Sequence, residues 1–368
     1  MSAAPAQLRG QRSRDRRRWP VGHDRYRSRW TNGRASAVLV HVPTRWLRRT
    51  APRPGYAGSR RTLCQTHRSH TRSGDEAGAT FPGVSASIDV CLVSYDSGDD
   101  LLAAIRSVAA HIPGASVAVQ ENGPGTNTID RARTLADELG VAFRAQHDPT
   151  NPGFGTACNA LARTSNAQWV LFLNPDAVIA TWPFADCEPS ARAVLGPEAV
   201  GGARSESHRG VRYRIIDELT RSWFRRWGPA PDGAGFVSGA ALLVHRDDHL
   251  HIGEFDEGFF LFYEDIEYCL RANRSGIPTH LASGWTVGHA GAHSTSPRFA
   301  QSLRWSYDSA CRFHGLQGES LVAYRIYVAT DAALRWCMQL ARRDTVRRRA
   351  YGQLCRVALR DITMAGRR

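Results

Sequence analysis

The chain has 368 residues and a formal net charge of +14, and all 48 of its basic residues are arginine. Because it contains no lysine, chemistry that needs a Schiff-base lysine or a lysine-bearing P-loop is excluded. Residues 1–80 carry 18 Arg against four acidic residues, residues 81–340 carry 21 Arg against 28, and residues 341–368 carry nine Arg against two. A nucleic-acid-binding protein is therefore disfavoured, because the central part is acidic and only the two ends are basic.

The first 85 residues are predicted to form a disordered, Arg-rich segment, because they show little hydrophobic periodicity. Only the short apolar run at 35–42 could form a strand. Two interpretations remain open: a basic arm that contacts nucleic acid or anionic lipid, or translated text upstream of the true start. Arg-rich, Lys-free sequence is typical of translated GC-rich non-coding DNA.

From residue 88 onward, short apolar runs alternate with segments of helical periodicity. Strands are predicted at 88–94, 117–120, 141–145, 169–173, 236–245 and 285–289, and helices at 101–108, 129–139, 155–163, 263–275, 299–314 and 320–342. This alternation predicts an α/β fold built from βαβ units with a mostly parallel sheet. Residues 182–234 are predicted to be irregular. The last helix is expected to pack on the domain, with a membrane-surface role as the alternative.

The eight cysteines include no CxxC pair, so a structural zinc site is disfavoured. Several lie in apolar runs, which favours buried reduced thiols over disulfides and a reducing compartment. No apolar stretch approaches the ~20 residues that span a bilayer, and the N-terminus lacks the apolar region of a signal peptide. These features predict a soluble, cytoplasmic protein.

Parallel sheets bind ligands at the carboxyl ends of their strands, and polar clusters follow the first two predicted strands. Ser94 and Tyr95 stand in a turn after the first strand, where the backbone could approach a base or ribose. Glu121 follows the second, and its carboxylate could accept a hydrogen bond from the imide N–H of uracil or thymine. Ordinary connecting turns are the alternative for both clusters.

Two further clusters suit a diphosphate. Asn151, Gly153 and Gly155 lead into a predicted helix, where glycines allow a phosphate to approach the backbone N–H groups. Asn174 and Asp176 follow a buried strand, where a carboxylate can hold Mg²⁺ or Mn²⁺ against a diphosphate. Capping of the next turn is the alternative for Asp176.

A later acidic pair, Glu264 and Asp265, follows a run of aromatic residues. Partial desolvation by these aromatics would raise the pKa of a carboxyl group and make it a better general base. Helix capping by Asp265 is the alternative. His289 follows the last predicted strand and is a candidate metal ligand, although a lone histidine is more often structural.

Taken in order, these motifs resemble the family 2 glycosyltransferases with a GT-A fold, and most of all their rhamnosyltransferase-like bacterial branch. The matching text is Val93–Ser97, Asn151–Gly155 with Asn159, Phe172–Asp176, Gly253–Glu257, Phe259–Asp265 through Cys269–Arg271, and His289 with Ser294. We therefore expect a glycosyltransferase domain at 86–315 and a C-terminal helical extension with a basic tail at 316–368.

The resemblance implies roles for single residues. Tyr95 and Glu121 would contact the nucleoside, and Asp176 with His289 would hold the divalent metal. Asp265, beside Glu264, would be the general base that deprotonates the acceptor hydroxyl. The implied reaction is inverting transfer of a sugar from a nucleoside-diphosphate donor to a glycan or lipid-linked acceptor in cell-wall or polysaccharide synthesis, at the inner face of the membrane.

The sequence departs from the family pattern around the nucleoside. Asp96 stands where the family usually has Asn, and Glu121 replaces the usual Asp. These changes leave dTDP-sugars, including dTDP-rhamnose, and UDP-sugars as candidate donors. The alternatives are a nucleotidyltransferase, which would usually carry a basic loop where 94–102 has no basic residue, and a non-catalytic nucleotide-sugar-binding protein.

Overall fold

The computed structural model describes residues 64–65, 87–184, 188–189, 192–201, 203–204, 214–218, 235–289 and 298–365. All of them belong to one unit of the chain, 60–368. The predictions for the Arg-rich segment, apart from 64–65, and for Ser294 fall outside these ranges.

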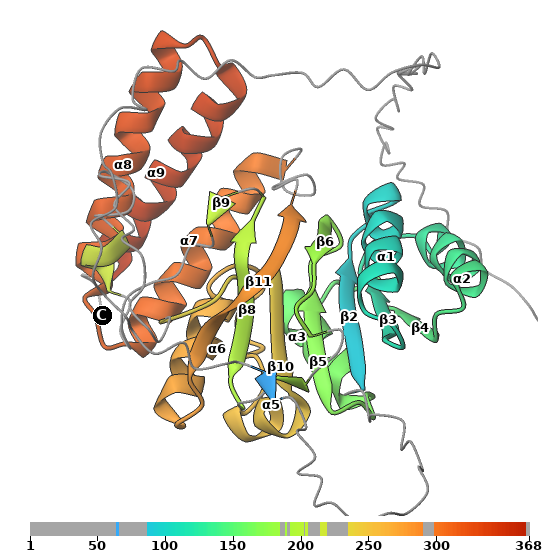
Figure 1. Cartoon of the computed structure of the whole chain (residues 1–368). Helices are drawn as coiled ribbons and strands as arrows, with labels where there is room; N and C mark the ends of the chain where they lie inside the picture. Colours follow the sequence, from blue (N-terminus) through green and yellow to red (C-terminus); the bar gives the residue numbers. More distant parts are fainter. Residues whose placement is uncertain are drawn as a thin grey trace, which may run out of the picture. The chain divides into compact units, whose positions relative to one another are not determined.

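A central sheet organises the fold, with the strand order β4-β3-β2-β5-β10-β8-β11-β6 and β9 paired to β8 (Figure 1). Its strands are β2 (Ile88–Ser94), β3 (Ser116–Glu121), β4 (Phe143–His147), β5 (Trp169–Leu173), β6 (Ala177–Thr181), β8 (Val194–Val200), β9 (Ala203–Arg204), β10 (Ala241–His245) and β11 (Thr279–His289). The two-residue strands β1 (Cys64–Gln65) and β7 (Glu188–Pro189) pair separately.

Four strands, β4, β3, β2 and β5, form the parallel part of the sheet. Every residue of β2 and of β5 is buried. Strands covered on both faces read as continuous apolar runs rather than as alternating ones. For this reason their bounds coincide with the strands predicted at 88–94 and 169–173.

The other half of the sheet is mixed. β10 is antiparallel to β5 and β8, β8 and β11 are parallel, and β6 is antiparallel to β11. The prediction that 182–234 is irregular was wrong for β8, which pairs with both β10 and β11. Gly196 and Pro197 obscure this strand in the sequence. Glycine is needed there because a Cβ at 196 would lie 2.6 Å from the Val237 Cβ.

Helices cover both faces of the sheet. They are α1 (Asp99–His111), α2 (Asn127–Leu139), α3 (Phe154–Arg163), α5 (Arg246–Ile252) and α6 (Glu264–Arg274). One core cluster joins α1 and α2 to β2 through Val90 and Leu92. The other joins α3 and α6 to the opposite face of the same strand through Cys91 and Val93. β2 is therefore the centre of a three-layer α/β fold.

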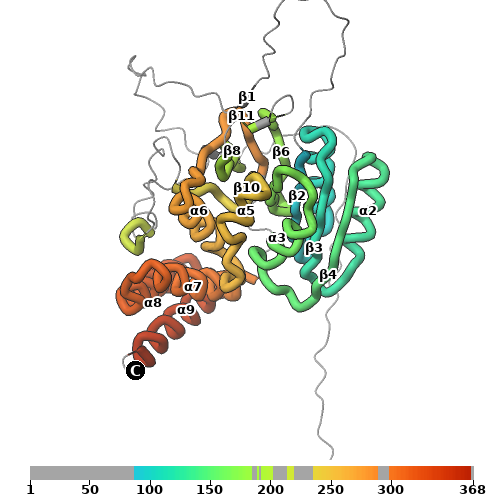
Figure 2. The backbone as a smooth tube through the Cα atoms, turned by 90° about the horizontal axis from the view of Figure 1, so that it is seen from below, coloured from blue at the N-terminus to red at the C-terminus, as the bar shows by residue number. Residues whose placement is uncertain are grey.

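The C-terminal part is helical: α7 (Phe299–Leu316), α8 (Leu321–Ala341) and α9 (Thr345–Ala365). The first two confirm the helices predicted at 299–314 and 320–342, whereas α9 was predicted only as a basic tail. Figure 2 shows the three helices grouped at one side of the sheet. Among the helices that the structure describes, none is both long and apolar enough to cross a membrane.

The described cysteines agree in part with the prediction of buried reduced thiols. Cys91, Cys158 and Cys269 are free and buried, and burial raises the pKa of each thiol. A raised thiol pKa lowers the thiolate fraction and makes these groups poor nucleophiles. Cys337, in contrast, is free and exposed.

Candidate functional site

The parallel strands bring three of the predicted clusters to one edge of the sheet. Ser94 at the end of β2 lies opposite Glu121 at the end of β3, and Leu92 lies opposite Leu173 at the end of β5. The turns after these strands therefore meet, and Asn174 follows directly. This meeting at the carboxyl edge is the geometry that parallel strands give a ligand site.

A cavity of about 280 Å³ opens at this edge. Besides Val93 and Ser97, it is lined by Ser94, Tyr95, Asn122, Asn151, Gly153, Phe154, Asn174, Pro175 and Asp176, and by Phe260, Leu261, Phe262, Arg298 and Trp305. Most of the predicted donor-binding residues are in this lining. Glu121 and Gly155 are not, and neither are Glu264 and Asp265.

Glu121 lies fully buried and organises the turn after β2. Its Oε2 accepts a hydrogen bond from the Ser94 hydroxyl at 2.6 Å, and its Oε1 accepts from the Asp96 and Gly123 N–H groups at 2.9 and 2.7 Å. Asp96 adopts a positive φ of 54° in this turn. The carboxylate thus holds the turn that carries Tyr95.

Gly153 and Gly155 are explained by contacts within the protein. Gly153 has a φ of 99°, and a Cβ there would lie 2.6 Å from the Phe260 carbonyl oxygen. The next N–H, of Phe154, donates to that same oxygen at 2.9 Å. A Cβ at Gly155 would lie 3.0 Å from the Phe255 Cβ. These glycines let α3 pack closely on the segment 253–262.

Asn174 and Asp176 form a tight turn between β5 and β6. The Asn174 N–H donates to the Ala240 carbonyl at 3.0 Å, and the Asn174 carbonyl accepts from the Ala177 N–H at 3.0 Å. In the sheet, His289 is the register partner of Ala177. The backbone of His289 therefore lies beside the residue that follows Asp176.

The acidic pair at the start of α6 divides into two different environments. Asp265 is half-buried, and its Oδ2 accepts from the Gly239 N–H at 2.8 Å. The next residue in the chain after Gly239 is Ala240, whose carbonyl accepts from the Asn174 N–H. Two hydrogen bonds therefore connect Asp265 to the turn that carries Asp176.

Glu264 is the desolvated member of the pair. It is buried, its Oε2 has no hydrogen-bond partner among the described residues, and burial, with the nearby Asp265, raises its pKa to about 8. A carboxyl group with this pKa carries a proton at neutral pH. The desolvation expected from the neighbouring aromatics therefore falls on Glu264.

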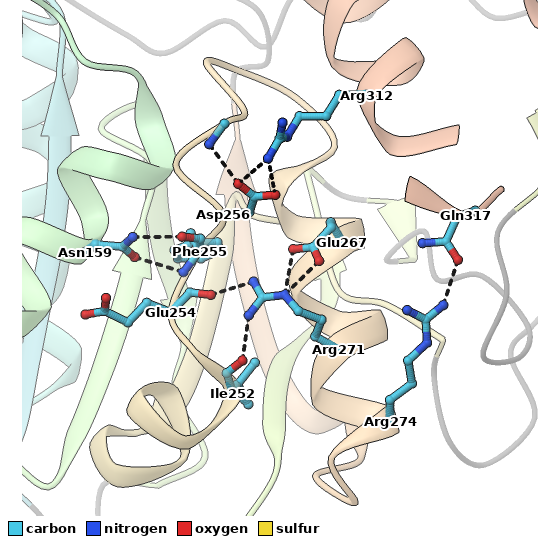
Figure 3. A network of polar contacts seen from close by, with 11 residues as sticks. Asn159, Ile252, Glu254, Phe255, Asp256, Glu267, Arg271, Arg274, Arg312 and Gln317 are labelled. Atoms are coloured by element: carbon cyan, nitrogen blue, oxygen red, sulfur yellow. Dashed lines mark hydrogen bonds and ion pairs between the residues drawn. The ribbon is translucent and has the colours of Figure 1, made fainter. Parts of the chain in front are cut away.

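A polar network holds the first part of the segment 253–262 (Figure 3). The last part of this segment, from Phe260 to Phe262, lines the cavity. Asn159 holds the Phe255 backbone through two hydrogen bonds of 2.9 Å. Arg271 donates to the Ile252 and Glu254 carbonyls at 2.6 Å and pairs with Glu267 at 2.7 Å. These bonds link the segment to both α3 and α6.

The C-terminal helices support the backbone in front of Glu264. Phe262 and Tyr263 have positive φ values of 71° and 67°, a costly conformation for non-glycine residues. The Tyr263 ring lies 5.5 Å from Phe313 and 6.3 Å from His314. The fully buried His314 lies between two carboxylates, with Nδ1 2.7 Å from Glu319 and Nε2 3.0 Å from Glu218.

Two lining residues, Arg298 and Trp305, lie outside every motif that the sequence offers. Arg298 directly precedes α7, and its guanidinium lies 4.2 Å from the centre of the Tyr95 ring. Trp305 on α7 packs on Phe260 with ring centroids 4.8 Å apart. Trp305 and Arg298 carry no motif, and they lie more than 100 residues from Asp176 in the chain. Phe260 was seen only as one of the aromatics before the acidic pair.

The charge of the cavity comes from two side chains. Among the described lining residues, Asp176 is the single acidic group and Arg298 the single basic one. No group of three His, Cys, Asp or Glu side chains among the described residues could hold a metal alone. A carboxylate such as Asp176 can still hold Mg²⁺, because Mg²⁺ is usually bound by one or two carboxylates together with substrate phosphates.

Residues 86–308 match the family model described as glycosyltransferase like family 2. The match covers more than half of the chain, so the protein belongs to this family. Membership confirms the predicted α/β glycosyltransferase fold and the predicted class of enzyme.

Two rhamnosyltransferases are similar in sequence. Rhamnosyltransferase WbbL of Escherichia coli (strain K12) is 30% identical over 78 residues, which are 21% of this chain and 30% of that protein. N-acetylglucosaminyl-diphospho-decaprenol L-rhamnosyltransferase of Mycobacterium tuberculosis (strain H37Rv) is 25% identical over 274 residues, covering 61% of this chain and 83% of that protein. The chain thus spans less than a third of the first relative and most of the second.

The solved structure of GalNAc-T7 with UDP, GalNAc and Mn²⁺ is also similar. It is 14% identical, with a TM-score of 0.45, over 60% of this chain and 48% of that one.

Proposed function

We propose that the protein is an inverting glycosyltransferase that moves a sugar from a nucleoside-diphosphate donor to a hydroxyl group of a glycan or lipid-linked acceptor. The observation that carries the proposal is the cavity at the carboxyl edge of the parallel strands, which pairs the Asp176 carboxylate with the Arg298 guanidinium. The two groups suit a nucleoside-diphosphate donor. The guanidinium can bind the diphosphate directly, and the carboxylate can hold a divalent metal against it.

In this proposal, the nucleoside of the donor occupies the end of the cavity near Tyr95. The Tyr95 ring, with Arg298 above it, offers a face against which a base or ribose can pack. Ser94, Asn122 and Asn151 add polar groups to the same lining. Glu121 acts on the nucleoside through the shape of the turn after β2, because its oxygens already accept hydrogen bonds from Ser94 and Asp96.

Asp176 would hold Mg²⁺ or Mn²⁺ against the diphosphate. His289, whose backbone pairs with Ala177 in the sheet, is proposed as the second ligand. When bound, the metal supplies positive charge that stabilises the departing nucleoside diphosphate. Arg298 would neutralise part of the same charge. Asn174 positions Asp176, because its backbone fixes the turn to Ala240 and Ala177.

Asp265 is proposed as the general base. It would take the proton of the acceptor hydroxyl as that oxygen bonds to the anomeric carbon, while the bond from this carbon to the diphosphate oxygen breaks. Attack and departure on opposite faces invert the configuration through an oxocarbenium-like transition state. The hydrogen bond from the Gly239 N–H at 2.8 Å orients the Asp265 carboxyl group. The protonated Glu264 beside it adds no competing charge at neutral pH.

For the sugar and acceptor, the proposal draws on the two relatives. Both are described as rhamnosyltransferases, and the name of the mycobacterial protein specifies a decaprenol-linked acceptor. We therefore take dTDP-rhamnose as the leading donor, with UDP-sugars as the alternative, and a polyprenyl-diphosphate-linked sugar as the acceptor. Such an acceptor lies in a membrane, so the enzyme would work at the inner membrane surface in cell-wall or polysaccharide synthesis.

The test is a thermal-shift panel of dTDP-rhamnose, UDP-sugars and GDP-sugars, each with and without Mn²⁺. We expect one nucleotide to raise the melting temperature, and the increase to grow with Mn²⁺. Asp176→Ala should lose the Mn²⁺-dependent part, whereas Asp137→Ala on the exposed side of α2 should retain it.

Incubation of the stabilising donor with polyprenyl-linked acceptors, followed by mass spectrometry, then tests transfer itself. Binding without any glycosylated product would favour the non-catalytic nucleotide-sugar-binding protein. Release of diphosphate from a sugar phosphate and a nucleoside triphosphate would favour the nucleotidyltransferase.

A further inference from the structure

The outer side of α8 is apolar along the whole helix. Val322, Ile326, Ala333, Cys337 and Leu340 are all exposed and lie on one side at 3.6 residues per turn, and we call this row the outer face of α8. Ile326 and Leu340 are 53% and 49% exposed. Every exposed residue of this fully described helix is uncharged. A helix that faces water normally shows the reverse pattern.

The charged residues of α8 are not exposed and bond either to α9 or to each other. Arg325 donates to the Asp361 carbonyl on α9 at 3.0 Å, and Arg335 pairs with Asp331 at 2.6 Å. Even Thr330, on the exposed side, donates its hydroxyl hydrogen to the Ile326 carbonyl at 2.9 Å. α8 therefore carries its charged side chains away from its outer face, which is left apolar.

α9 borders this face with a row of exposed arginines: Arg349, Arg356 and Arg360. Trp336 packs against α9 at Gly352, where a Cβ would lie 3.3 Å from its indole ring. Trp336 stands between Ala333 and Leu340 on α8, and Gly352 stands between Arg349 and Arg356 on α9. α8 and α9 form a helical hairpin. This contact therefore indicates that the apolar row of α8 and the arginine row of α9 lie on the same side of the hairpin.

We propose that the outer face of α8 and the arginine row of α9 form a docking surface for an anionic lipid bilayer. Residues 321–365 hold nine Arg against three Asp, so this surface is complementary to acidic headgroups. Among the described residues, Arg349 and Arg356 take part in no ion pair. A helix with an apolar face beside basic residues lies in the interface plane of a bilayer without crossing it. A second copy of the chain fits less well, because a symmetric contact would bring the two arginine rows together.

The opposite side of α8 leads to the candidate site. Tyr324 there is buried, and its ring lies 4.7 Å from His314, which in turn contacts Tyr263 in front of Glu264. A bilayer on the outer face of α8 would thus lie on the side of this helix opposite to Tyr324, which supports the backbone in front of Glu264. The inference deepens the proposed function by naming the surface that meets the membrane of a lipid-linked acceptor, and it rests on that function only for this purpose.

The test is sedimentation of the full chain with vesicles of phosphatidylcholine alone or mixed with phosphatidylglycerol. We expect binding to the mixed vesicles, weakened by salt. Ile326→Glu with Leu340→Glu should weaken it at least about 30-fold, because two buried apolar side chains are lost. Arg349→Gln with Arg356→Gln should weaken it roughly 30-fold, at about 1 kcal/mol per arginine.

Matched double variants away from the hairpin serve as controls. Leu139→Glu with Leu250→Glu replaces exposed leucines on α2 and α5, and Arg106→Gln with Arg133→Gln removes exposed arginines on α1 and α2. These controls should bind like the unaltered chain. Hydrogen exchange with and without vesicles should show protection at 322–340.

The proposal would be overturned if the hairpin variants, folded by circular dichroism, bound as tightly as the controls, or if protection appeared only at 1–80. A loss of self-association in the Ile326→Glu, Leu340→Glu variant, with vesicle binding retained, would assign the face to a second copy instead. The vesicles contain neither donor nor acceptor, so these results are independent of whether the enzyme transfers a sugar.

Discussion

At the residue scale, Asp265 and Glu264 are adjacent carboxyl groups in different environments. Asp265 accepts a backbone hydrogen bond and is half-buried, whereas Glu264 is buried with an unpartnered oxygen. A carboxyl group whose burial raises its pKa, as at Glu264, is typical of catalytic sites. This contrast makes each residue separately testable.

Asp265→Asn tests the general base. Asparagine keeps an oxygen that can accept from Gly239 but cannot take the acceptor proton, so transfer should fall by about 10²–10⁴-fold. Donor binding in the thermal-shift assay should persist. Asp247→Asn, a change at an exposed site on α5, should leave both unchanged. Normal turnover in Asp265→Asn would remove it from the role of base.

The raised pKa of Glu264 predicts how the free energy of unfolding depends on pH. Its folded pKa of about 8 lies above the ordinary value of 4.5, so its contribution to stability is present below pH 4.5 and is lost as the pH rises through 8. Glu264→Gln should therefore raise the free energy of unfolding above pH 8 by a few kcal/mol, on the order of 1.4 per pKa unit. Urea titrations at pH 5, 7 and 9 would measure this, with the exposed Glu138→Gln as the control. Equal effects at all three pH values would show that Glu264 is not desolvated.

At the element scale, the close packing of α3 on the segment 253–262 depends on Gly153. Gly153→Ala would place a Cβ 2.6 Å from the Phe260 carbonyl at a φ of 99°, and should cost about 1–3 kcal/mol of stability and reduce donor binding. Gly125→Ala, where a Cβ meets nothing within 4 Å, should be neutral. Thermal melts of both variants measure the difference, and equal melting temperatures would contradict this account of α3.

At the scale of the whole molecule, the net charge of +14 belongs to residues 1–80, because 30 Arg and 30 acidic residues remain from residue 81 onward. Removing residues 1–80, with their 18 Arg, should lower the salt concentration needed for elution from heparin and leave transfer unchanged. Elution salt and transfer rate are the two measurements. A folded truncated chain with no transfer would instead give this segment a part in the reaction.

The sequence by itself determined the central strands, most helices and the residues at the strand ends. β2 and β5 are buried on both faces, so their apolar runs are legible locally, and Asn174 and Asp176 follow from where β5 ends. The amphipathic helices were predicted for the same reason, because their periodicity is a local property of the chain. β8 was missed because Gly196 and Pro197 interrupt its pattern, and β10 and β11 supply its pairing.

Only the tertiary structure decided which distant groups meet. Arg298 and Trp305 reach the cavity because α7 packs beside the segment 253–262. Glu264 is the desolvated carboxyl because the packing around the start of α6 buries it and leaves Asp265 half-buried. The apolar side of α8 faces outward because Tyr324 and Ala332, on its other side, are buried. Periodicity shows that a helix has two faces, but long-range packing selects the one that is buried.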